Sequence, residues 1–261
     1  MWADNGDVKL YVYCDIVSHL SLITGTVKPM ATLIITRRLY LITSLQSVEP
    51  PTRTARRRNL AIEWILGLGI PLLVAGPLYY VVQWQRFNVK PVFGCTDAPD
   101  DSILGILLLN SGIVLPPLVS IIFYYPHVAH TFYRHSREVN QFLRSNNSVS
   151  RTNYFRILVL ASVDVLLTLP IGLVIIVLNV KGHAQMFGPL PFYHGWTQDH
   201  VGWQPVGLSY AYVVSEGTLD LALFYFEYWT SPILAFVIFA LFGATSEARA
   251  SYWRIICSIC G

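Results

Sequence analysis

Apolar residues gather in five long runs along the chain, and shorter polar segments separate these runs. The runs cover residues 16–42, 60–83, 102–125, 154–180 and 219–242. A transmembrane helix needs about 20 predominantly apolar residues, because it must cross a hydrocarbon core roughly 30 Å thick. The pattern therefore predicts an all-α fold: a polytopic transmembrane helix bundle with five spans in one domain, residues 1–261.

Every predicted span contains proline, which a soluble helix tolerates poorly. An interior proline costs a soluble helix about 3 kcal/mol. In a membrane bundle, neighbouring helices and waters can satisfy the carbonyl that the proline frees. The prolines are Pro29, Pro71, Pro77, Pro116, Pro117, Pro170 and Pro232.

Composition agrees with a membrane domain. The 261 residues are 54% hydrophobic and only 13% charged, whereas soluble domains carry about 25% charged residues. Residues 1–9 are polar and acidic and lack a basic segment before an apolar one, so no signal peptide is expected. The motifs HExxH and GxSxG and the phosphate-binding loop are absent from the sequence, so no enzyme and no cofactor are expected.

Basic residues are distributed asymmetrically between the two sides of the predicted bundle. Of the 18 basic residues, 13 lie in or beside the segments 43–59, 126–153 and 243–261, and all 13 are arginine. Cytoplasmic segments carry such an excess. These segments are therefore predicted to be inner loops and an inner tail, with 84–101 and 181–218 as outer loops, the N-terminus outside and the C-terminus in the cytosol.

The inner arginines have two possible roles. They could attract anionic lipid, at about 1 kcal/mol each near the surface, or they could dock a partner protein. The residues considered are Arg37, Arg38, Arg56, Arg57, Arg58, Arg134, Arg137 and Arg151.

Lys28 lies inside the first predicted span, next to Pro29. An ionisable residue at this depth is costly, so it is expected to face the bundle and to pair with an acid. The deeper acids are Asp164 and Glu227, while Glu63 lies near the cytosolic end and could pair with a neighbouring arginine. Lys28 could instead extend its ammonium group to the interface.

The four cysteines fall into two pairs. Cys14 and Cys95 are both predicted at the outer boundary, in an oxidising compartment, where they could form a disulfide or remain separate buried thiols. Cys257 and Cys260 follow an amphipathic stretch in the tail and could be S-acylated or unmodified. Three histidines of the outer loop 181–218 are spaced irregularly, and no metal site is expected from them.

Ordered motifs along the chain carry a resemblance. The motifs are VYCDIVSHL (12–20), RRLY (37–40), GLGIPLL (67–73), Gly94-Cys95, Arg156 to Pro170 with an acid six residues before the proline, Tyr228-Trp229 through Pro232, and FALFGATSEAR (239–249). In this order they resemble the fungal lipopeptide (a-factor-type) mating pheromone receptors, which are class D G-protein-coupled receptors encoded at mating-type loci.

The resemblance implies a function and partners. The ligand would be a prenylated peptide pheromone, the signalling partner a heterotrimeric G protein, and the location the plasma membrane; no nucleic acid is implied. In that family the sequence CDI stands at the head of the third helix, and here it stands at 14–16. The five spans would then correspond to helices three to seven, the first two being absent, and such a chain is expected to insert but not to signal alone.

Two other hypotheses stay open at this point. A transporter would use Lys28, Asp164 and Glu227 as a polar site near the membrane midplane. It would predict paired halves with similarly interrupted helices, and no such repeat is seen in the sequence. A remnant that inserts without signalling is the third possibility.

Overall fold

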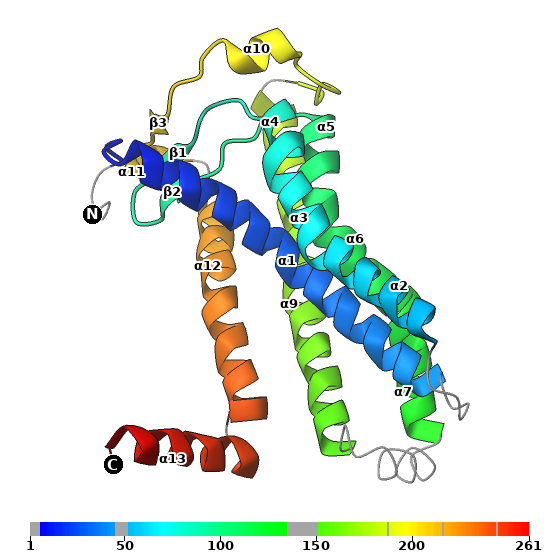
Figure 1. Cartoon of the computed structure of the whole chain (residues 1–261). Helices are drawn as coiled ribbons and strands as arrows, with labels where there is room; N and C mark the ends of the chain where they lie inside the picture. The colour runs from blue at the N-terminus through cyan, green and yellow to red at the C-terminus, as the bar shows by residue number, and fades with distance from the viewer. Residues whose placement is uncertain are drawn as a thin grey trace.

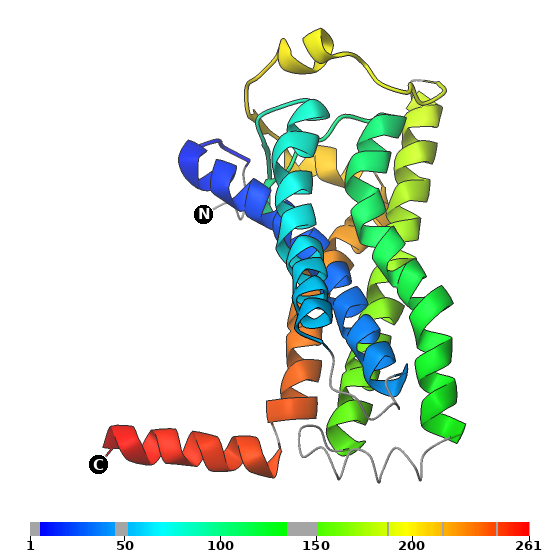
Figure 2. The ribbon, with the colours of Figure 1, turned by 45° about the vertical axis from the view of Figure 1, so that its right-hand side comes forward.

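The computed structural model describes residues 6–44, 52–134, 151–186, 188–215, 217–243 and 245–260. Long helices form a bundle, and a small sheet lies at one of its ends, near the start of α1 (Tyr11–Ser44) and of α12 (Thr218–Ile238) (Figure 1). We call this end the sheet end. At the opposite end, helix α13 (Ser246–Cys260) lies across the direction of the bundle, and we call this the α13 end (Figure 2).

Five long helical segments make up the described part of the bundle. The first is α1 (Tyr11–Ser44), which runs obliquely across the others in Figure 1 and packs against three of the other segments. The second joins α2 (Arg53–Trp64), η1 (Ile65–Gly69), α3 (Ile70–Leu73), η2 (Val74–Leu78) and α4 (Tyr79–Val81). The third joins α5 (Ile103–Gly105), η3 (Ile106–Asn110), α6 (Ser111–Val119), η4 (Ser120–Tyr124) and α7 (Tyr125–Arg134). The last two are α9 (Arg151–Met186) and α12 (Thr218–Ile238), which continues as η5 (Phe239–Gly243).

Within the described residues, four helices are long and apolar enough to cross a membrane. They are Arg53–Val81, Ile103–His130, Arg156–Ala184 and Phe224–Gly243. The predicted helical, polytopic class is therefore confirmed, but the count of five is not, because α1 is not among the four. Serine, threonine and charged residues recur along α1 and make it more polar than the other long helices.

Wide π-helical turns interrupt two of the long rods. The segments η1 to η4 have this form, and η2 contains Pro77. Proline lacks an amide hydrogen and displaces the preceding turn, and single π turns of this kind occur inside α-helices. At Pro77 the winding of the helix therefore changes without the helix ending.

Small residues allow the central helices to approach closely. A Cβ atom added to Gly112 of α6 would lie 3.3 Å from Thr26 Cγ2 of α1, and one added to Gly172 of α9 would lie 3.1 Å from Val114 Cγ2. Interfaces between membrane helices are enriched in small residues for this reason. By contrast, Leu115, Phe123 and Leu166 are more than half exposed, as expected for side chains that face lipid.

The sheet was not predicted from the sequence. Strands β1 (Asn88–Lys90) and β2 (Gly94–Thr96) pair antiparallel, and β3 (Val206–Gly207) pairs parallel with β1. The segment between α9 and α12 also contains two short helices, α10 (Trp196–His200) and α11 (Tyr210–Ser215). The sheet thereby joins the α4–α5 connection to the α9–α12 connection.

Candidate functional site

A disulfide fastens the sheet to α1. Cys14, in the first turn of α1, is bonded to Cys95 of β2, and their Cα atoms are 5.2 Å apart. Both cysteines are buried together with Phe87 and Val89. The structure thus joins the two cysteines that the sequence places at one boundary, and the cross-link fixes the sheet end of α1.

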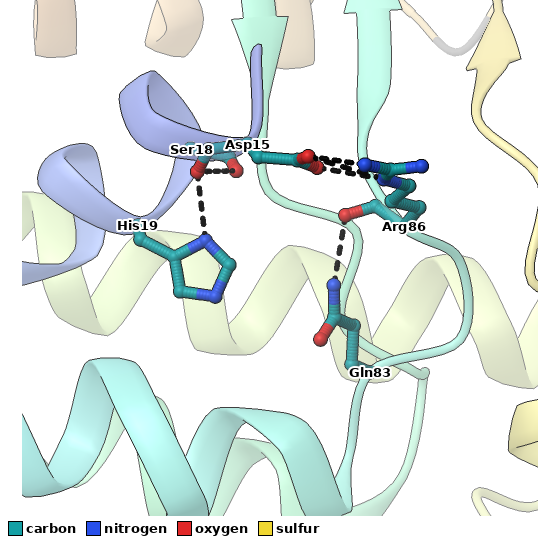
Figure 3. A network of polar contacts seen from close by, with 5 residues as sticks. All are labelled: Asp15, Ser18, His19, Gln83 and Arg86. Carbon is teal, nitrogen blue, oxygen red and sulfur yellow. Dashed lines mark hydrogen bonds and ion pairs between the residues drawn. The ribbon is translucent and has the colours of Figure 1, made fainter. Parts of the chain in front are cut away.

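An ion pair lies beside the disulfide. Arg86 Nε donates to Asp15 Oδ1 at 2.9 Å, and Gln83 Nε2 donates to the Arg86 carbonyl oxygen at 2.8 Å (Figure 3). Hydrogen bonding to Asp15 raises the pKa of Arg86. Ser18 and His19 instead contact the Asp15 carbonyl oxygen of their own helix. The sheet end of α1 is therefore held by both a covalent and an ionic contact.

Aromatic side chains connect the β1–β2 turn to α12. The Phe93 ring lies 5.1 Å from the rings of Tyr225 and Tyr228, between centroids. Lys90 Nζ lies 3.8 Å from the centre of the Phe224 ring, a cation–π arrangement. The turn is thus the contact between the cross-linked hairpin and the last long helix.

The intramembrane polar residues make contacts that differ from the predicted pairing. Lys28 Nζ donates to Ser231 Oγ of α12 at 2.7 Å. Asp164 of α9 is buried and accepts a hydrogen bond from the Thr32 hydroxyl of α1. Among the described residues, no ion pair joins Lys28 to Asp164 or Glu227, and the Glu227 side chain is exposed on α12. Lys28 and Asp164 are therefore each hydrogen-bonded to a hydroxyl group, whereas the sequence had predicted that Lys28 pairs with an acid.

Polar contacts continue along α1 toward the α13 end. The hydroxyls of Thr36 and Ser120 are 3.0 Å apart and buried. At the next residue, Arg37 Nη2 donates to Asn59 Oδ1 at 2.7 Å. Arg38 and Glu63 form a bidentate salt bridge, in which Arg38 Nε donates to Glu63 Oε1 at 2.6 Å and Arg38 Nη2 donates to Glu63 Oε2. The sequence predicted that Glu63 could pair with a neighbouring arginine. Glu63 does pair with an arginine, but this is Arg38 of α1 and not a residue of its own helix.

The other predicted basic and acylation positions are only partly described. Arg56, Arg57 and Arg58 are exposed on α2. Arg137 lies outside the described residues, and the backbones of Arg134, Arg151 and Cys260 are helical. Cys257 is a free, exposed cysteine on α13, close in sequence to exposed Tyr252 and Trp253.

Sequence reasoning missed a cluster at the sheet end. Asp100, His194 and Asp199 each offer one ligand atom, and these atoms lie within 4.8 Å of one another. Burial raises the pKa of Asp199, and the charge of Asp100 raises it further. In the sequence, His194 and Asp199 stand five residues apart in a loop rich in aromatic residues. Nothing in that spacing indicates that Asp100, which lies in a different loop much earlier in the chain, is their partner.

A family model and individual curated proteins that resemble the chain all describe pheromone receptors. The family model described as Pheromone A receptor matches residues 1–260. The Pheromone B alpha 1 receptor of Schizophyllum commune is 29% identical over 266 residues, which cover 100% of this chain and 40% of the relative. The Pheromone B alpha 2 receptor of the same species is 29% identical over 97% of this chain and 37% of its own length.

A shorter relative comes from another fungus. Pheromone receptor 1 of Mycosarcoma maydis is 28% identical over 96% of this chain and 68% of its own length. The chain thus spans about two fifths of the Schizophyllum relatives and about two thirds of the Mycosarcoma one. No solved structure matches the chain.

Proposed function

Because the chain belongs to the Pheromone A receptor family, whose model matches residues 1–260, we propose that it acts in a G-protein-coupled receptor for a mating pheromone. The family is one of receptors and not of enzymes. The ligand is a peptide carrying a prenyl group and reaches the sheet end. A heterotrimeric G protein is contacted at the α13 end.

The path of α1 is the observation that carries this proposal. One helix holds the disulfide and the Asp15–Arg86 pair at the sheet end, the Thr32–Asp164 contact in the middle, and the Arg38–Glu63 pair at the other end. A displacement of α1 by a ligand at the sheet end would therefore alter contacts at the α13 end. Allostery requires such an element, whose position both sites influence.

The proposed orientation places the sheet end outside the plasma membrane. The disulfide suits an oxidising compartment, while the inner arginines suit the cytosolic surface. The helix α13 carries Arg249, Arg254 and exposed aromatic side chains, which suits a helix lying at the interface. We propose that five segments span the membrane, with α1 included because its neighbours accept its polar side chains, and that Cys257 is a site for S-acylation.

Orientation can be tested with a glycosylation sequon. Asn146, Asn147 and Ser148 form one on a loop predicted to be inner, outside the described residues. We expect Asn146 to remain unmodified when the chain is translated into microsomes. A sequon engineered at Asp97 by Asp97→Asn and Pro99→Ser, in the outer loop, is the positive control. A glycan at Asn146 would contradict the orientation.

Ligand class can be tested by equilibrium binding to membranes that contain the chain. A peptide pheromone with a prenyl group should show displaceable binding at least about tenfold tighter than the same peptide without it, because each buried CH₂ contributes about 0.8 kcal/mol. Membranes without the chain correct for partition of the lipid group into the bilayer. Equal displaceable binding of both peptides would reject a prenylated ligand.

A further inference from the structure

Three ligand-type side chains from two distant segments meet at the sheet end of the bundle. Asp100 belongs to the α4–α5 connection, and His194 and Asp199 belong to the α9–α12 connection. Gly195 separates the histidine from helix α10 and adopts a φ of 106°, which glycine accepts without strain. The turn at Gly195 brings both loop residues toward Asp100.

The neighbours of Asp100 hold it in place for ligation. Its amide nitrogen donates to the Val82 carbonyl oxygen at 2.7 Å. The Ser102 hydroxyl donates to its Oδ1 at 3.0 Å and, as the N-cap of α5, accepts from the Gly105 amide at 2.9 Å. Its other oxygen, Oδ2, lies 3.2 Å from His194 Nδ1. Contacts of this kind fix the orientation of metal ligands in proteins.

The spacing matches the size of a zinc coordination sphere. Zinc bonds to nitrogen and oxygen measure about 2.0–2.2 Å, so two ligands of a tetrahedral site are about 3.3 Å apart. The His194–Asp100 distance of 3.2 Å already has this value. The full cluster, within 4.8 Å, would need to contract by only about 1.5 Å.

Asp199 provides a second, independent observation. Its side chain is fully buried, and neither carboxylate oxygen accepts a hydrogen bond of ordinary geometry among the described residues. The Tyr193 hydroxyl donates to the Val81 carbonyl oxygen at 3.2 Å, although it is close enough to Asp199 to offset part of the rise that burial causes in the pKa of that carboxyl. A buried carboxylate that accepts no well-formed hydrogen bond is costly, and a bound cation would reduce this cost.

We propose that Asp100, His194 and Asp199 bind a divalent transition metal ion of the zinc class. Imidazole nitrogen favours zinc, copper and nickel over magnesium and calcium, and the two carboxylates supply charge. Three protein ligands leave one position for water. The metal would join the α9–α12 connection to the outer ends of α4 and α5.

Other contacts indicate what the metal would stabilise. The Ile103 and Leu104 amides donate to the carbonyl oxygens of Pro191 and Phe192, both at 3.0 Å. These hydrogen bonds hold the α9–α12 connection against the first residues of α5. A metal at the cluster would fasten the same connection a few residues further along, and so order the surface that we assign to the outer side.

The test is zinc binding by the whole purified chain in lipid nanodiscs after chelator treatment. Titration calorimetry should show one Zn²⁺ per chain. Asp199→Asn and His194→Gln should each lower the affinity by about 100-fold or more, since even contacts behind the ligands are worth about 10–100-fold. The matched controls Asp7→Asn and His130→Gln, which are not members of the cluster, should bind as the parent does.

Thermal unfolding separates loss of the site from loss of the fold. In chelator, Asp199→Asn should be at least as stable as the parent, because the neutral amide replaces a fully buried carboxylate. Zinc should raise the melting temperature of the parent and not of Asp199→Asn. Absence of stoichiometric binding by the parent, or equal zinc affinity of Asp199→Asn and the parent, would overturn the proposal.

Discussion

Loss of the Cys14–Cys95 bridge should lower the free energy of unfolding by about 3–5 kcal/mol. The two cysteines are 81 residues apart, and a cross-link that closes so long a loop restricts the unfolded chain strongly. The variants Cys14→Ala and Cys95→Ala should therefore unfold at a lower fraction of SDS in mixed micelles. Because the bridge fixes the sheet to α1, binding of the proposed peptide ligand at this end should fall with it.

Two controls distinguish the cross-link from packing at the same positions. Cys257→Ala removes a free, exposed cysteine and should leave the unfolding curve unchanged. A thiol reductant should destabilise the parent by a similar amount but should not affect the two bridge variants. Mass spectrometry without reduction that finds free thiols at both positions in folded protein would contradict the bridge.

Replacement of Thr32 by valine should destabilise the chain by about 1–3 kcal/mol. The threonine hydroxyl is the donor to the buried Asp164 carboxylate, whose other oxygen has no hydrogen-bond partner among the described residues. Valine keeps the shape but leaves a buried acceptor unsatisfied, and that is the cost. Unfolding in mixed micelles measures the loss.

The same helix offers a matched control. Thr24 is exposed and, within the part of the chain that the structure describes, donates only to the Ser21 carbonyl oxygen of α1, so Thr24→Val should change stability by less than about 0.5 kcal/mol. Adding Asp164→Leu to Thr32→Val should recover stability, because both polar partners are then gone. Additive losses in the double variant would mean that the two side chains do not interact.

The lengths of the apolar runs predicted the helices well, because lipid imposes a strong rule. A spanning segment must satisfy its own backbone hydrogen bonds, so each apolar run of sufficient length becomes a helix. Four of the predicted runs, from 60–83 onward, fall on helices that are long and apolar enough to span. The run 16–42 is helical too, although its polar side chains set it apart.

Contacts between distant segments could not be predicted in the same way. The sequence favoured an acid for Lys28, because charge is the strongest partner for charge; the structure gives it Ser231. The contact between Thr32 and Asp164 was not predicted, because threonine is common in apolar helices and its hydroxyl commonly bonds to the backbone of its own helix. Likewise Asp100 meets His194 and Asp199 only through the packing of two loops. Such pairings depend on helix tilt and rotation, which hydropathy does not encode.

Peptide-triggered nucleotide exchange on a heterotrimeric G protein tests most directly whether α1 carries a signal between the two ends. The chain is assayed alone and with a two-helix N-terminal complement from a Schizophyllum relative, because the chain covers only 40% of that relative's length. The complemented form should respond to prenylated peptide, and Thr32→Val should weaken the response while Thr24→Val does not. A complemented chain that binds the peptide without accelerating exchange, or a response unaffected by Thr32→Val, would contradict coupling through α1.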